Sequence, residues 1–126
     1  MDLDFDKLGG LVAAVIQDAS SGRVLMVGFM NREAAELTEK DGVVTFYSRS
    51  RSRLWTKGES SGHKLVVREM AVDCDGDALL IKVDALGPGV CHEGYESCFF
   101  RIRRGAGWSI EEDRAFDPEA VYGSQR

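Results

Sequence analysis

The residues of this sequence that are best suited to bind a metal ion are its three cysteines. Cys91 and Cys98 bracket a polar, glycine-containing segment, and Cys74 lies between two aspartates, which are poor neighbours for an inert buried thiol. Zinc favours thiolates and is usually four-coordinate, so three cysteines would leave one position for water, whose pKa the metal lowers. From spacing alone two alternatives stay open: three unrelated buried thiols, or a closed structural site with His92 or His63 as the fourth ligand.

Around Cys74, every second residue is an aspartate. On an extended backbone, Asp73, Asp75 and Asp77 would project from one side of a strand and Cys74 from the other. Three carboxylates so close repel one another unless a cation neutralises them, and Mg²⁺ or Ca²⁺ prefers such oxygens. An EF-hand is excluded, because Ala78 stands where that loop requires glycine. The cluster therefore predicts a hard-cation site of another kind, with a solvated charged turn as the alternative.

Positive charge gathers within residues 47–62, where arginines alternate with serines. If the strand that starts at Val43 continues through this segment, Arg49, Arg51 and Arg53 share one face, and guanidinium groups match phosphate well. The glycine- and serine-rich loop that follows could cradle an anion, and the tryptophan before it could stack on a base. An exposed edge strand or a short RNA-binding tract explains the alternation about as well. The predicted substrate-binding residues are Arg49, Arg51, Arg53, Trp55, Lys57, Ser60 and Ser61.

The whole chain has the composition of an ordinary globular protein, and we expect residues 1–126 to form a single domain. Its net charge of −5 does not suit a duplex-DNA-binding protein. No segment approaches the roughly 18 apolar residues that span a bilayer, and the acidic start lacks the order of a signal peptide. We therefore expect a cytoplasmic protein without a membrane or nucleic-acid partner, in which an odd number of cysteines argues against disulfides.

The elements that position these residues are mostly strands. Residues 11–16 and 23–30 are predicted to form a hairpin, and a helix is expected to begin after the N-cap Asn31 and to end at Asp41-Gly42. Further strands are expected at residues 43–53, 64–72, 78–83 and 99–103, with loops at 58–62 and 87–89. The predicted fold is mainly β (α+β), a compact, strand-rich, barrel-like domain with one clear helix.

Taken together, these segments resemble the phosphoribosyl-AMP cyclohydrolase family, in its form without a fused pyrophosphohydrolase. The blocks Leu-Trp-Thr-Lys-Gly-Glu and Asp-Cys-Asp-Gly-Asp are the most specific of the match. Departures lie in the loop from Cys91 to Cys98, where Glu93, Tyr95 and Glu96 replace residues expected to be smaller or basic, and in the tail, which matches nothing recognisable. The matching stretches follow the family's order and cover residues 28–34, 44–51, 54–62, 72–80 and 91–99.

The resemblance implies a hydrolase of histidine biosynthesis that opens the purine of phosphoribosyl-AMP at its N1–C6 bond, giving an imidazole carboxamide. It also implies an intertwined homodimer in which zinc is held by Cys74 of one chain with Cys91 and Cys98 of the other. The aspartates of the cluster match the family's Mg²⁺ ligands. The hypothesis for the reaction is that a zinc-bound hydroxide attacks C6 while His92 moves the proton. A hydrogen bond to the metal site, or zinc ligation, is the alternative role of His92.

Two other functions fit part of the pattern. A zinc-dependent nucleotide deaminase would use similar chemistry, but its His-x-Glu and Pro-Cys-x-x-Cys signatures are missing from the sequence. A zinc-stabilised RNA-binding module would use the arginine–serine segment with Trp55 and Tyr47. It would give no role to the three aspartates, which would repel RNA.

Overall fold

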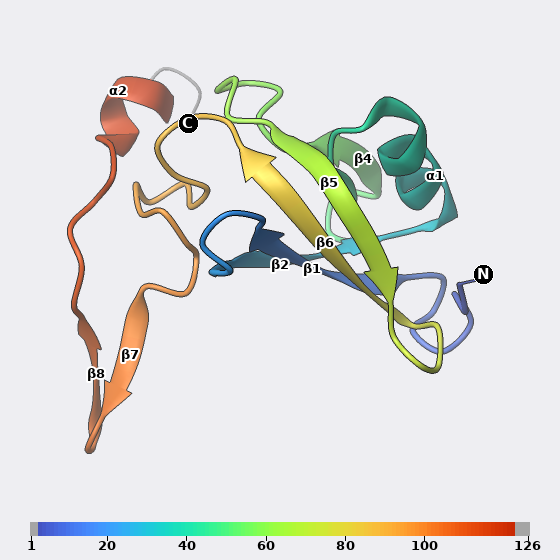
Figure 1. Ribbon diagram of the computed structural model, residues 1–126, viewed down its shortest axis with the longest axis horizontal. Coiled ribbons are helices and arrows are strands. Elements are labelled where there is room, and N and C mark those ends of the chain that lie inside the picture. Colours follow the sequence, from blue (N-terminus) through green and yellow to red (C-terminus); the bar gives the residue numbers. More distant parts are fainter. Residues whose placement is uncertain (1–2, 123–126) are drawn as a thin grey trace.

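A four-stranded sheet forms the centre of the molecule in the computed structural model, which describes residues 3–122 (Figure 1). The strands lie in the order β2-β1-β6-β5; β1 runs parallel to β6, and the two outer pairs are antiparallel. The pairs β3–β4 and β7–β8 form two further, two-stranded sheets. The mainly β, α+β class is thus confirmed. The elements are β1 (Val12–Asp18), β2 (Val24–Met30), α1 (Arg32–Asp41), β3 (Thr45–Ser48), β4 (Arg53–Thr56), β5 (Leu65–Val72), β6 (Ala78–Ala85), β7 (Arg101–Arg104), β8 (Gly107–Ile110) and α2 (Pro118–Tyr122).

The helix α1 begins and ends where its capping residues predict. The Asn31 side chain accepts a hydrogen bond from the Ala34 backbone N–H at 2.8 Å, which satisfies one of the free donors of the first turn. At the other end, Gly42 adopts a left-handed conformation with φ 74° and donates to the Thr38 carbonyl. The buried Thr38 hydroxyl then accepts from the Thr45 N–H at 3.0 Å, which joins the helix to β3. The predicted helix and the preceding β1–β2 hairpin are both confirmed.

One predicted strand is wrong. The strand from Val43 does not continue to Arg53, because β3 ends at Ser48 and a turn leads into β4. The Ser48 hydroxyl accepts from the Arg51 N–H at 3.3 Å inside that turn. Antiparallel pairing then places Trp55 beside Phe46, so this hairpin buries aromatic surface that one long polar strand would leave exposed.

Residues Asp73–Asp77, here called the acidic turn, form a turn between β5 and β6, so the condition of an extended backbone, under which the three aspartates would share one side, is not met. Asp73 Oδ1 accepts hydrogen bonds from the backbone N–H groups of Asp77 and Ala78, at 3.0 and 3.3 Å. Gly76 has φ 79°, a conformation that favours glycine. The side chain of Asp73 therefore closes the turn, which the alternating pattern does not reveal.

The hydrophobic core lies on one face of the main sheet, beneath α1 and the β3–β4 hairpin. Val12, Ala14 and Ile81 are fully buried there with Phe46. The ring of Phe46 lies directly on the sheet at Gly28, where an added Cβ would come within 2.5 Å of it. Glycine is thus required at this position of β2 for close approach of the aromatic ring.

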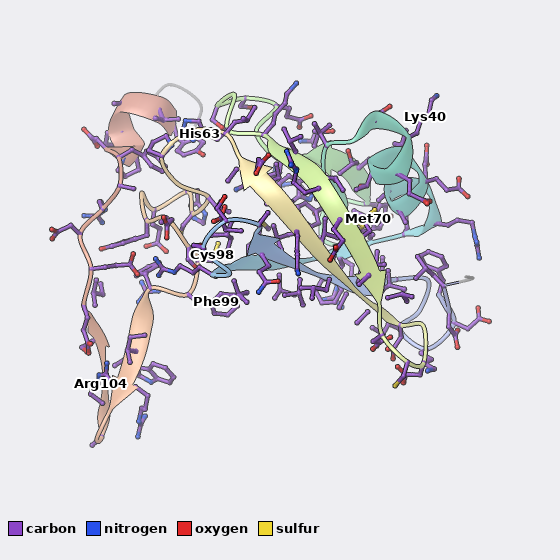
Figure 2. The ribbon with its side chains drawn as sticks, viewed as in Figure 1. Lys40, His63, Met70, Cys98, Phe99 and Arg104 are labelled. Carbon is purple, nitrogen blue, oxygen red and sulfur yellow. The ribbon has the colours of Figure 1, made fainter. Side chains whose placement is uncertain are left out.

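An arm formed by β7 and β8 projects away from the main sheet (Figure 1). Every residue of the two strands is exposed except Ser109, and Trp108 has 66% of its surface accessible. Cys98 and Phe99 lie where the chain leaves the sheet for this arm (Figure 2). No helix within residues 3–122 is long and apolar enough to cross a membrane.

Candidate metal centre and substrate cleft

The segment Cys91–Cys98, here called the cysteine loop, is a tight loop fastened to the start of β2. Within the loop, the Cys91 N–H donates to the Tyr95 carbonyl at 3.1 Å. The Cys98 N–H donates to the Leu25 carbonyl at 2.7 Å. Ser97, which is fully buried, donates its hydroxyl to the Val24 carbonyl at 2.8 Å. These contacts bring the two cysteines to one place, although six residues separate them in the sequence.

The two thiols of the cysteine loop interact directly. Burial and, next, the Cys91 thiol raise the pKa of Cys98 to about 11, against an opposing effect of the Lys57 ammonium. Cys91 is buried, and its sulfur accepts a hydrogen bond from the Glu93 N–H at 3.5 Å. The Lys57 ammonium favours the thiolate of Cys98, which is the form that binds metal, but burial and the Cys91 thiol outweigh it in the metal-free chain. Two thiols held next to each other in one loop are the ligand type and arrangement of half a zinc site.

Cys74 lies at the opposite end of the sheet. It is exposed in the acidic turn, whereas Cys98 lies at the end of the sheet next to the arm (Figures 1 and 2). Within residues 3–122, the one group of three or more potential metal ligands that converge to within 4.8 Å is the three aspartates of the acidic turn. A single chain thus brings together two of the three predicted zinc ligands.

The acidic turn gathers the three predicted carboxylates, and two of them lie next to one lysine. Lys7 Nζ lies 3.1 Å from Asp75 Oδ2 and 3.8 Å from Asp77 Oδ2, and it donates to the Asp75 carbonyl. The hydrogen bond from Lys7 lowers the pKa of Asp75, whereas the neighbouring Asp73 raises the pKa of Asp77. These opposite shifts are what three adjacent carboxylates with one nearby cation produce.

A cleft of about 400 Å³ brings together most of the predicted substrate-binding residues. It is lined by the β3–β4 hairpin, by the loop Gly58–Gly62, here called the serine loop, and by His92 of the cysteine loop. Arg49 does not line it, because its guanidinium lies 4.8 Å from the centre of the Phe29 ring. The predicted residues that line the cleft are Arg51, Arg53, Trp55, Lys57, Ser60 and Ser61.

Trp55 and Lys57 each combine packing with exposure to this cleft. The Trp55 ring lies 4.9 Å from the Phe46 ring, so part of the indole belongs to the core while another part lines the cleft. Burial lowers the pKa of Lys57, and the Cys98 and Cys91 thiols oppose that effect. The lysine thus connects the cleft electrostatically to the cysteine pair.

The two histidines occupy different surroundings. His92 is exposed and lines the cleft, and it also lines a neighbouring cavity of about 900 Å³. His63 is packed against Gly87 and lies edge-on to Phe116, with ring centres 5.3 Å apart. Its Nδ1 atom is buried and has no hydrogen-bond partner among the described residues. His92 is therefore the histidine placed to meet a ligand in the cleft.

A cation that sequence reasoning missed holds the cysteine loop to the tail. The Arg23 guanidinium, in the β1–β2 turn, binds both carboxylate oxygens of Glu112 and lies 2.8 Å from Glu96 Oε1. The hydrogen bond from Arg23 lowers the pKa of Glu112. The partners are 73 and 89 residues away from Arg23, so no local pattern signals their contact.

Comparison with known proteins gives one consistent result. A family model described as phosphoribosyl-AMP cyclohydrolase matches residues 26–100. A protein of that name from Solibacter usitatus is 62% identical over 125 residues, which cover 99% of each chain. Another from Desulforapulum autotrophicum is 49% identical over 123 residues, covering 97% of this chain and 98% of the relative. A third, from Chromobacterium violaceum, is 50% identical over 113 residues, or 90% and 86% of the two chains.

Proposed function

Because this chain belongs to the phosphoribosyl-AMP cyclohydrolase family, a family of enzymes, we propose that it hydrolyses phosphoribosyl-AMP as a cytoplasmic step of histidine biosynthesis. The bond broken is N1–C6 of the purine, which opens to an imidazole carboxamide. The observation that carries the proposal is the cleft, in which phosphate-binding side chains and His92 line one cavity beside the cysteine pair.

The basic side chains of the cleft hold the substrate through its phosphates. Arg51 and Arg53 present planar donors, and Ser60 and Ser61 add hydroxyls from the serine loop. The purine lies toward His92, because this residue is next to Cys91 in the chain and lines the same cavity. We propose that His92 accepts and returns the proton of the hydrolytic step.

We propose that zinc is bound by Cys91 and Cys98 together with Cys74 of the partner subunit. The direct interaction of the two thiols, the N–H donor to Cys91 and the nearby Lys57 support the first half of this site. The exposed position of Cys74 leaves it available to a second chain. When bound, the metal supplies a water molecule of lowered pKa next to the cleft.

An uncovered apolar surface supports the proposed homodimer. On the face of the main sheet opposite the core, Val27 and Leu80 are 45% and 37% exposed. On the arm, Trp108 and Ile110 are also exposed. Exposed apolar patches of this kind mark association surfaces. We propose an intertwined dimer in which the arm embraces the second copy and completes the barrel-like shell.

The acidic turn is the proposed Mg²⁺ site. Its three carboxylates lie within 4.8 Å of one another, and oxygen ligands suit this hard cation. Asp73 Oδ1 is already engaged by two backbone N–H groups, so Asp75 and Asp77 have the freer oxygens. Mg²⁺ would replace Lys7 as the neutralising charge.

The experiment that tests the shared zinc site uses two variants, Cys74→Ser and Cys98→Ser. Each alone should lose zinc and lose turnover of phosphoribosyl-AMP, followed by ultraviolet absorbance. Co-expressed chains should recover activity, because a mixed dimer keeps one site whose three cysteines are intact. If the two variant chains pair at random and each zinc site spans the interface, the zinc content should recover to about a quarter of the wild-type value. Full activity of Cys98→Ser alone, or no recovery in the mixture, would contradict the site.

A further inference from the structure

The tail of the chain is fastened across the cysteine loop. We call residues Arg114–Tyr122 the strap. The backbone N–H groups of Ala115 and Phe116 both donate to the Gly94 carbonyl, at 2.7 and 3.2 Å. Arg114 Nε donates to the Glu93 carbonyl at 2.8 Å. The strap is thus a specific part of the folded chain, although it lies beyond the matched residues 26–100.

The strap also reaches His63, the residue that follows the serine loop, through an aromatic contact. The Phe116 ring lies edge-on to His63, and its centre is 6.1 Å from the ring of Tyr122. The view in Figure 2 places His63 next to α2, the helix that ends the strap. Because the strap contacts both the cysteine loop and His63, its aromatic end is held in place next to the cleft.

Tyr122 is the residue of the strap that lines the substrate cleft, which His92 and Trp55 also line. The Trp55 ring packs against Phe46 in the core. Tyr122 therefore gives the cleft a second aromatic surface, from a different segment of the chain. The cations of this cleft come from the β3–β4 hairpin and its following residues, Arg51, Arg53 and Lys57. An aromatic ring offers a face on which a base can stack, which none of these cations provides as well.

We propose that Tyr122 is a substrate-contacting residue whose ring packs against the purine of the nucleotide while the phosphates lie toward the arginines. This inference rests on the proposed function, since the base must reach the cysteine pair beside His92. The remainder of the strap positions the ring, and Phe116, which lies between His63 and Tyr122, supports it.

The test compares Tyr122→Ala with Tyr122→Phe, using Ala120→Ser as a control on the exposed side of the same helix. Two quantities are measured: KM and kcat for phosphoribosyl-AMP, and the dissociation constant for AMP, which needs no turnover. Tyr122→Ala should raise both KM and the AMP dissociation constant about tenfold, as expected for one lost aromatic–base contact. Tyr122→Phe should stay much closer to the wild type, because the ring is retained. Ala120→Ser should change neither.

Zinc content and dimer mass of each variant separate a lost contact from a misfolded strap. Wild-type KM and AMP affinity in Tyr122→Ala would overturn the inference, as would a loss of kcat and zinc at unchanged affinity. The lack of AMP binding by the wild type would overturn it as well. Absence of turnover by the wild type would instead contradict the proposed function, and weaker AMP binding in Tyr122→Ala would then still support the contact.

Discussion

The acidic turn and the cysteine loop are the two candidate metal-binding segments, and they are built in opposite ways. The acidic turn is closed by Asp73, whose carboxylate binds backbone groups four and five residues away. The cysteine loop depends on distant segments: β2 binds Ser97, the strap binds Gly94, and Arg23 binds Glu96. Ligand geometry is therefore encoded locally in the turn and by tertiary structure in the loop.

This difference predicts that the cysteine loop is the more sensitive of the two to single substitutions. The largest effect is expected for Gly94→Ala. Gly94 has φ 99°, and an added Cβ would lie 2.6 Å from the Phe116 carbonyl oxygen. The strain and the displaced strap should lower the free energy of unfolding by about 3 kcal/mol. Urea unfolding followed by circular dichroism measures the loss, and a parallel zinc analysis should show weaker metal retention.

Gly22→Ala is the matched control for this substitution. Gly22, in the β1–β2 turn, also has a positive φ, 79°, but an added Cβ would meet no atom within 4 Å. The backbone cost alone should be about 1 kcal/mol, without loss of zinc. Equal effects of the two substitutions would show that the strap contact does not support the cysteine loop.

The same difference determines how much of the protein can be predicted from its sequence. The α1 caps, the β1–β2 hairpin and the serine loop depend on neighbouring residues, and all were found as predicted. For the acidic turn, the sequence left an extended segment and a turn open, because alternating aspartates also occur where a side chain closes a turn. The long arginine strand was misjudged because the pairing of Phe46 with Trp55 decides where that segment folds back.

The cleft shows the same division between local and distant information. Arg51, Lys57 and Ser60 were identified from their residue types within one short segment. Tyr122 and Arg23 were not, because their roles depend on contacts with segments far away in the chain. The parallel pairing of β1 with β6 is another contact between distant segments that no short sequence pattern specifies.

An intermediate effect is expected for Arg23→Met, which removes the link between the cysteine loop and the tail. The side chains of Arg23 and Glu112 are 34% and 29% exposed, so solvent weakens their interaction and the loss should be about 1 kcal/mol at pH 7. Arg23 lowers the pKa of Glu112, so this stabilisation is complete above the unfolded pKa of about 4.3 and is lost as the pH falls further. Unfolding midpoints of both proteins measured from pH 7 to pH 3 should therefore converge.

Arg68→Met provides the comparison for an ion pair outside the cysteine loop. Arg68 binds Asp84 at 3.0 Å, between β5 and β6, and its side chain is 63% exposed. Its removal should change the unfolding free energy by less than about 0.5 kcal/mol. If Arg23→Met cost no more than Arg68→Met at pH 7, or if its effect did not shrink in acid, the proposed link would be refuted.

The smallest effect is expected at the acidic turn, for Lys7→Met. Without Lys7, the carboxylates of Asp75 and Asp77 lose their nearby cation, but both are close to solvent and the turn keeps its own hydrogen bonds. The melting temperature without added metal should fall only slightly. If Mg²⁺ replaces Lys7, MgCl2 should raise the melting temperature of the variant more than that of the wild type, because the variant has no ammonium to displace. Lys40→Met, at the end of α1, controls for the loss of one positive charge. If MgCl2 raised the melting temperatures of the wild type, Lys7→Met and Lys40→Met equally, the acidic turn would not be a Mg²⁺ site, despite its converging carboxylates.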